Sequence, residues 1–173
     1  QLDDAVSCIE ALDAMGWSAD RLIVAGDSAG GNLCLALTQL LVSKGRKVPR
    51  ALALISPWAD ASATGNRSAD DAVIDPQWIE SLRPLIGPQN LLKTPAMSPL
   101  YGSFEQFPPT LIQSAAGEVI AHIVQDLVER MQAERVAVNW THAPGLWHDF
   151  QLHAGTVPEA AQALREMSDF IVK

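Results

Sequence analysis

The sequence predicts an α/β domain built on about four parallel strands with flanking helices. Apolar runs of four to six residues alternate with longer segments in which apolar side chains recur at helical spacing. Several of these runs are continuous, which is typical of parallel strands that are covered on both faces. With 173 residues and 48% hydrophobic content, the chain is long enough for one domain with a buried core, and nothing in its length requires two.

The expected elements follow one another in a regular order. Apolar residues from Leu2 to Met15 recur at helical spacing, and Gly16 stands where a C-terminal cap belongs. A strand over 22–25 then leads through a glycine-rich turn into a second helix, whose apolar stripe runs from Leu33 to Leu41. The other strands are expected at 51–56, 110–115 and 136–141, and helices follow the first, third and fourth strands, the last one extending to Ile171. This rhythm favours a parallel sheet with right-handed crossovers.

Residues 58–107 interrupt the rhythm. The segment is too long for a simple crossover and contains five prolines. Within it, residues 75–82 form a capped pattern, Asp-Pro followed by an apolar face, that predicts a short helix. An insertion at the carboxyl end of a strand usually shapes a substrate pocket, so we expect a lid-like insertion here. A plain surface excursion is the alternative.

Composition excludes several classes of function. Twelve basic and twenty acidic residues give a net charge of −8 without a basic block, so a nucleic-acid partner is not expected. No apolar stretch approaches the roughly 20 residues that span a bilayer. Cys8 and Cys34 each lie on the apolar side of an expected helix, so buried reduced thiols without a metal are predicted. We expect a cytoplasmic protein without a cofactor or metal, acting on a small molecule; a homodimer stays open.

The strongest motif is Gly26-Asp27-Ser28-Ala29-Gly30-Gly31-Asn32, directly after the first strand. It matches the G-x-S-x-G nucleophile elbow, in which a serine is presented at a sharp strand-to-helix turn. Glycines on both sides of Ser28 are expected to remove Cβ atoms that would collide there. A phosphate-binding turn is the alternative, but the G-x-G-x-x-G spacing and the P-loop lysine are both missing.

A nucleophilic serine needs a histidine base within reach, and the chain has four histidines. His148 lies in a loop just past the last strand, between aromatic residues that would fix its ring and exclude water. His142 is expected to be structural, His122 to pair with Asp126 on a helix surface, and His153 has no companion pattern. The position after the last strand therefore favours His148 as the base.

The acid that orients the base should follow the third strand, between serine and histidine in the chain. Glu118 is the first carboxylate past that strand and is the predicted acid, with a plain salt bridge as the alternative. Asp126 is a distant second because it lies further into the next helix. Asp149 adjoins the base in sequence, but sequence neighbours in a loop rarely face each other.

Taken together, these motifs resemble the hormone-sensitive-lipase-like esterases, also called family IV carboxylesterases/lipases, of the α/β-hydrolase fold. The resemblance rests on the elbow at 26–32, on Ser98-Pro99-Leu100-Tyr101-Gly102 with the strand entry at 107–112, and on the histidine loop at 145–150. It covers essentially the whole chain. The resemblance implies that Ser28 is the nucleophile, His148 the base and Glu118 the acid.

Two departures from the family pattern affect what we expect of this chain. Where many members have a pair of aspartates after the acid, this chain has Ala121-His122. The His-Gly-Gly-Gly oxyanion motif of the family is also missing, and only the last four of its eight strands have counterparts. We therefore expect a single partial domain over residues 1–173, a C-terminal portion. In this portion the Ala29 N–H is expected to supply one oxyanion donor. The portion by itself is expected to have weak activity or none.

The leading hypothesis is a serine carboxylesterase that hydrolyses short-chain carboxylic esters through an acyl-enzyme. Trp58, Trp78 and Tyr101 are candidates for the acyl or alcohol pocket, with core packing as the alternative for each. Two other hypotheses stay open. One is a non-catalytic ligand-binding protein on the same fold, and the other is a peptidase or amidase of the same class.

Overall fold

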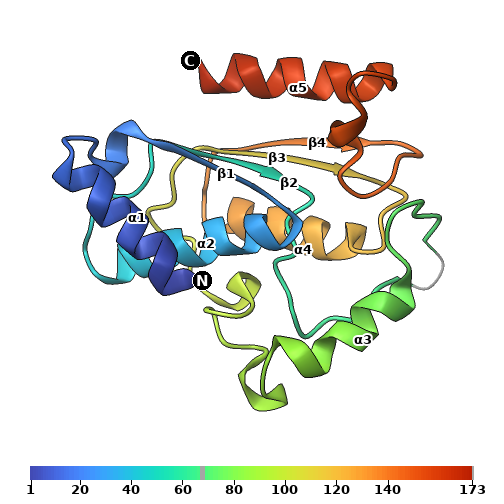
Figure 1. Ribbon diagram of the computed structural model, residues 1–173, viewed down its shortest axis with the longest axis horizontal. Coiled ribbons are helices and arrows are strands. Elements are labelled where there is room, and N and C mark those ends of the chain that lie inside the picture. The colour runs from blue at the N-terminus through green and yellow to red at the C-terminus, as the bar shows by residue number, and fades with distance from the viewer. Residues whose placement is uncertain (67–68, 173) are drawn as a thin grey trace.

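The fold centres on four parallel strands in the order β1-β2-β3-β4, as the sequence predicts (Figure 1). The computed structural model describes residues 1–66 and 69–172. Strand β2 pairs with β1 on one side and β3 on the other, and β3 pairs with β4. The carboxyl ends of all four strands consequently lie along the same side of the sheet. The strands are β1 (Ile23–Asp27), β2 (Ala51–Ile55), β3 (Thr110–Ala115) and β4 (Val138–Ala143).

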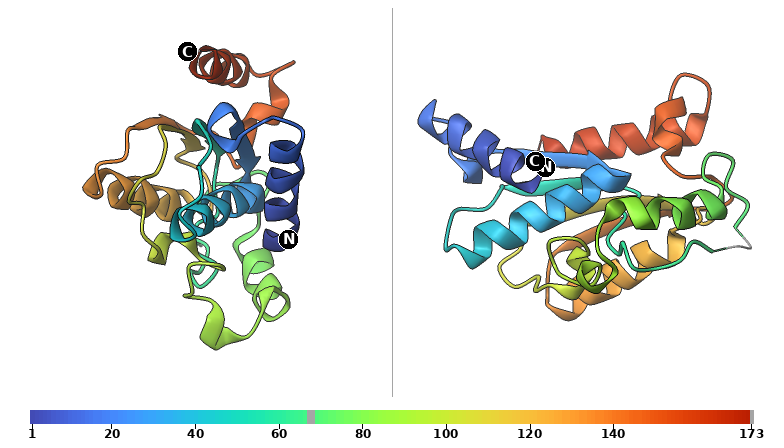
Figure 2. Two further views of the ribbon diagram at one scale, coloured as in Figure 1. Left: turned by 90° about the vertical axis from the view of Figure 1, so that its left-hand side faces the viewer. Right: turned by 60° about the horizontal axis from the view of Figure 1, so that its bottom comes forward.

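Helices cover both faces of the sheet (Figures 1 and 2). Helices α2 (Ser28–Ser43) and α4 (Ala121–Ala133) lie on one face, and α5 (Pro158–Ile171) lies across the other. Helix α1 (Leu2–Ala14) packs against α2, where Ile9, Leu37 and Leu41 form a separate apolar cluster. The helices after β1, β3 and β4 stand in the predicted order.

Burial is deepest around β3, whose six residues are all buried. The main core lies between the sheet and helices α2 and α4, with Leu35, Leu54 and Ile112 fully buried in it. A smaller cluster forms under α5, where Phe150 packs with Ala115 and Ala163. Strand β1 is more exposed than β3 and contains no buried residue. The acid-bearing strand β3 is therefore more deeply buried than the two outer strands of the described sheet, β1 and β4.

The insertion over 58–107 contains the short helix that the sequence predicts, α3 (Pro76–Ile86). Its N-cap is Asp75, whose side chain accepts the Gln77 N–H at 2.7 Å. Figure 1 shows α3 lying apart from the sheet, beyond α2 and α4. Ile79 of α3 is buried in the main core, so the insertion is attached to the domain rather than extended into solvent.

Two expectations about local structure need correction. Cys34 is buried, but Cys8 is exposed on α1, because the apolar face that contacts α2 does not include it. The last strand begins at Val138 instead of 136, because Val136 N–H still bonds to Met131 O in the turn that ends α4. Within the described part of the chain, no helix has both the length and the apolar character to cross a membrane.

Candidate active site

Ser28 stands at the junction between β1 and α2, and its backbone adopts a left-handed conformation with φ of 49°. Non-glycine residues enter this region at a cost and usually do so where the surrounding structure imposes it. The Ser28 carbonyl accepts the Trp58 N–H at 3.0 Å, which ties the junction to the start of the insertion. This is the sharp strand-to-helix turn that the elbow motif predicts.

The glycines around Ser28 serve different purposes, and the expectation for one of them is wrong. A Cβ at Gly26 would lie 2.5 Å from the Gly30 backbone and 2.8 Å from Cys34 Sγ, so no side chain fits there. A Cβ at Gly30 would meet only Asp27 Oδ1, at 3.8 Å, which is ordinary contact. The close approach occurs instead at Gly31, where a Cβ would lie 2.7 Å from Pro57 Cβ.

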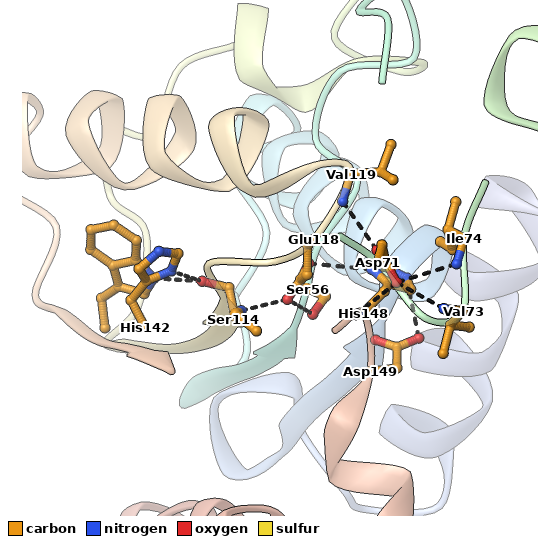
Figure 3. Close-up of polar contacts among 12 residues, drawn as sticks. Ser56, Asp71, Val73, Ile74, Ser114, Glu118, Val119, His142, His148 and Asp149 are labelled. Carbon is orange, nitrogen blue, oxygen red and sulfur yellow. Dashed lines mark hydrogen bonds and ion pairs between the residues drawn. The ribbon is translucent and has the colours of Figure 1, made fainter. Parts of the chain in front are cut away.

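Glu118 lies three residues beyond the end of β3 and is fully buried. Its Oε1 accepts the Ala115 N–H at 2.5 Å and the Ser56 hydroxyl at 2.7 Å (Figure 3). Its Oε2 lies 3.3 Å from His148 Nδ1. A buried carboxylate needs such partners because an unpaired charge in the interior is strongly unfavourable. The structure thus places the predicted acid next to the predicted base.

His148 lies in the loop after β4 and is 3% exposed. Burial acts to lower the pKa of its imidazole, but the hydrogen bond to Glu118 and the charges of Asp149, Glu118 and Asp71 outweigh this effect. The net result is a pKa raised above the usual 6.5. With Nδ1 turned to Glu118, the other nitrogen, Nε2, is the one that could receive a proton from a nucleophile.

Asp149 faces the base, contrary to the expectation that it would point elsewhere. Its backbone is left-handed, with φ of 53°, and this conformation turns its carboxylate back so that Oδ2 lies 3.3 Å from His148 Nε2. Burial raises the pKa of Asp149 to about 6, with the charge of His148 opposing the rise. His148 therefore has carboxylates near both ring nitrogens.

The Ser28 hydroxyl does not bond to the base in this structure. Nε2 of His148 is buried and forms no hydrogen bond among the described residues, although Asp149 Oδ2 lies 3.3 Å away as an ion-pair contact. Ser28 and the Glu118–His148 pair nevertheless follow β1, β3 and β4 at the same side of one parallel sheet. Contacts between nucleophile and base are often long in the absence of substrate and tighten when it binds.

The other histidines and the second candidate acid lie apart from this cluster. The Nδ1 of His142 is 3.0 Å from the Ser114 hydroxyl, and its ring packs on Trp140, which agrees with a structural role. His153 packs edge-on against Trp147. His122 and Asp126 are exposed on α4. No group of three or more metal-ligating side chains gathers anywhere in 1–66 or 69–172.

A cavity of about 570 Å³ adjoins the elbow. Ala29 and Asn32 of α2 form one side, and the insertion forms much of the rest through Trp58, Leu85 and Met97. Ala29 N–H belongs to the first turn of α2, whose N–H groups have no intrahelical partner, so it can serve as an anion donor. Because residues of the insertion line this cavity, the arrangement agrees with an insertion that shapes a substrate pocket.

The three candidate pocket aromatics occupy different places. Trp58 lines this cavity and also packs on the main core. Trp78 is 52% exposed on α3, and Tyr101 donates its hydroxyl proton to Asp60 Oδ2 at 2.8 Å; neither lines this cavity.

Two residues that support the site were missed at the sequence level. Ser56 bonds Glu118, and a polar residue that ends an apolar strand beside the acid-bearing strand was the available signal. Asn32 donates to Trp58 O at 2.8 Å and to Met97 O at 3.0 Å, joining α2 to both ends of the cavity wall. The elbow motif indicates the serine and carries no signal for these two Asn32 contacts.

The family follows from a match to a family model described as the alpha/beta hydrolase fold, over residues 1–152. The chain belongs to this α/β-hydrolase family. An esterase from the bacterial hormone-sensitive lipase family superposes with a TM-score of 0.90 at 30% identity, covering 98% of this chain and 58% of that one. A hormone-sensitive lipase from a metagenome library gives a TM-score of 0.91 at 31% identity, covering 99% and 60%. The predicted resemblance is confirmed.

Among curated relatives, the α/β-hydrolase chain is 30% identical to an esterase of Acinetobacter venetianus over 98% of its length. It is 31% identical to the esterase LipU of Mycobacterium tuberculosis, also over 98%. It spans 57% and 60% of the length of these two proteins.

Proposed function

We propose that the protein containing this chain is a serine carboxylesterase that hydrolyses short-chain carboxylic esters through an acyl-enzyme. The observation that carries the proposal is the buried Glu118–His148 pair, which follows β3 and β4 at the same side of the sheet as the left-handed Ser28 that follows β1. Relatives named esterase agree with this chemistry.

In the proposed reaction, His148 Nε2 takes the Ser28 hydroxyl proton as Oγ bonds to the ester carbonyl carbon. The negative charge that develops on the carbonyl oxygen faces the Ala29 N–H at the start of α2. When the bond to the alcohol breaks, His148 returns the proton to the leaving oxygen. Water then repeats the sequence on the acyl-enzyme and releases the carboxylic acid and the free serine.

Glu118 contributes by holding the imidazole. Its carboxylate fixes Nδ1 as the protonated nitrogen and stabilises the imidazolium that forms during each transfer. Ser56 and the Ala115 N–H hold the carboxylate in turn, so that it does not rotate away from the base. The cavity beside Ala29 is the proposed acyl or alcohol pocket, with Trp58 in its wall.

The test uses the complete protein that carries this sequence, with p-nitrophenyl acetate and the matching anilide. We expect hydrolysis of the ester that is absent in Ser28→Ala, and labelling of the Ser28 peptide by a sulfonyl fluoride, read by mass spectrometry. Preferred cleavage of the anilide would indicate an amidase. Binding of p-nitrophenyl acetate without turnover, and without labelling of Ser28, would indicate a binding protein.

A further inference from the structure

Asp71, in the insertion, contacts the loops of both the acid and the base. Its Oδ2 accepts the N–H of Val119, the residue after Glu118, at 3.0 Å. Its Oδ1 accepts the N–H of His148 itself at 3.3 Å. Figure 3 shows the carboxylate between these two backbone groups. The two donors lie 48 and 77 residues away along the chain, so one side chain joins three separate segments.

The carboxylate is also held on its own side. Oδ1 accepts the Val73 N–H at 3.0 Å and the Ile74 N–H at 3.2 Å, which closes a turn around Asp71. Four backbone donors therefore share two acceptor oxygens. An amide of the same shape has one oxygen and would turn an N–H₂ group toward at least one donor. The arrangement specifically requires a carboxylate.

The loop that carries Glu118, residues 116–120 (the acid loop), has little room to move away from these contacts. Asn66 N–H donates to Val119 O at 2.8 Å, so the insertion bonds both the N–H and the carbonyl of Val119. Gly117 N–H donates to Leu146 O at 3.0 Å, and a Cβ on Gly117 would collide with that same oxygen. The acid loop is thus packed between the insertion and the histidine loop.

We propose that Asp71 is a positioning residue of the catalytic site, one that sets the contact between Glu118 and His148 by joining their loops. The inference rests on the proposed esterase function and deepens it. Because the same insertion forms the wall of the cavity beside Ala29, Asp71 also ties the placement of the base to the segment that shapes the pocket.

The proposal is distinguished from simple loop stabilisation by its effect on the base. The charges that face His148 come from Glu118, Asp149 and Asp71, and each favours the protonated imidazole. Removing the Asp71 charge should therefore lower the pKa of His148 as well as loosen the histidine loop. A residue that only stabilised the insertion would change the melting temperature and leave this titration in place.

The experiment compares Asp71→Asn with Asp70→Asn in the complete protein. Asp70 is exposed and one residue away, so it matches the charge change without the bridge. With p-nitrophenyl acetate and active sites counted by the initial burst, Asp71→Asn should lose about 10- to 100-fold in kcat, with KM changed less than about threefold. The His148 titration, followed by NMR, should shift to lower pH. Asp70→Asn should match the parent in both.

Three results would overturn the proposal. Asp71→Asn could equal Asp70→Asn in kcat and in the His148 titration. Alternatively, the Asp71→Asn protein could contain fewer active sites by the burst measurement while each remaining site keeps the parent kcat. Asp71→Glu, which retains the charge and covers the case of an unfolded Asp71→Asn, could equal the parent in both readouts despite its longer reach. If the parent shows no Ser28-dependent turnover, the esterase proposal fails, and the titration still decides whether Asp71 positions His148.

Discussion

The two sides of the site are built in different ways. Glu118 and His148 are almost fully buried, rest on the core around β3 and are held by Ser56, the Ala115 N–H and Asp71. Ser28 stands at the β1–α2 junction in a left-handed conformation, and its hydroxyl makes no bond to the base. The base and acid are thus positioned by side-chain contacts, whereas the serine is held through its backbone, by its left-handed conformation and the hydrogen bond from the Trp58 N–H. Substitution of the serine should therefore lower kcat without lowering the stability of the fold, whereas substitution of the acid should lower both.

The largest effect is expected at the serine. Ser28→Ala should reduce kcat for p-nitrophenyl acetate by at least about 10⁴-fold, because no other group can form the acyl-enzyme. Its melting temperature should hardly change, because the hydroxyl contributes no bond to the base. Ser28→Gly should be equally inactive and more stable by about 1 kcal/mol, since glycine adopts a positive φ without strain. Thermal denaturation that shows Ser28→Gly to be less stable would contradict this contrast.

At the buried acid, kcat and the free energy of unfolding should decrease together. Glu118→Gln should lower kcat by about 10³- to 10⁴-fold, because the amide cannot stabilise the imidazolium or accept from all three neighbours. It should also lower the free energy of unfolding by about 3 kcal/mol, the scale seen when one partner of a buried pair is removed. Urea titration measures the stability change. Ser56→Ala, which removes one bond, is the control and should cost about 1 kcal/mol.

A pair of glycine substitutions tests the claim that backbone geometry positions the serine. Gly26→Ala should cost about 2 kcal/mol or more, because its Cβ meets the Gly30 backbone and Cys34. Gly30→Ala should be neutral or stabilising by about 0.5 to 1 kcal/mol, since its Cβ has space inside a helix. Equal losses of stability in both variants, measured by urea titration, would disprove this account of the elbow.

The smallest effect is a shift in pH dependence. The raised pKa of His148 places the acid limb of kcat/KM above pH 6.5, with activity lost as the pH falls through it. Asp149→Asn removes a charge that raises this pKa, so the limb should move to lower pH. The pKa of Asp149 itself rises from 3.8 to about 6 on folding, so its ionisation destabilises the folded state as the pH climbs through that window.

In the parent, stability should therefore decline between about pH 4 and pH 6, and in Asp149→Asn this decline should be smaller. Denaturation at several pH values measures this, and kcat/KM profiles measure the limb. An unchanged limb would show that the Asp149 carboxylate does not influence the base in solution.

The order of strands and helices, the turn at Ser28 and the strand ends that carry Glu118 and His148 could all be predicted from the amino-acid sequence. These features are local or topological: apolar periodicity marks the elements, and parallel strands bring their carboxyl ends to one side. For the same reason the insertion was evident from its length and prolines, and its helix from the Asp-Pro start at Asp75.

The side chains that support the acid and the base could be identified only from the folded chain. Asp71 meets Val119 and His148 across 48 and 77 residues, and no local pattern encodes such a contact. The left-handed backbone at Asp149 turns its carboxylate toward the base, and the close approach at Gly31 depends on Pro57 from the next strand end. Each depends on the packing of loops against one another, which is set by the fold as a whole rather than by spacing along the chain.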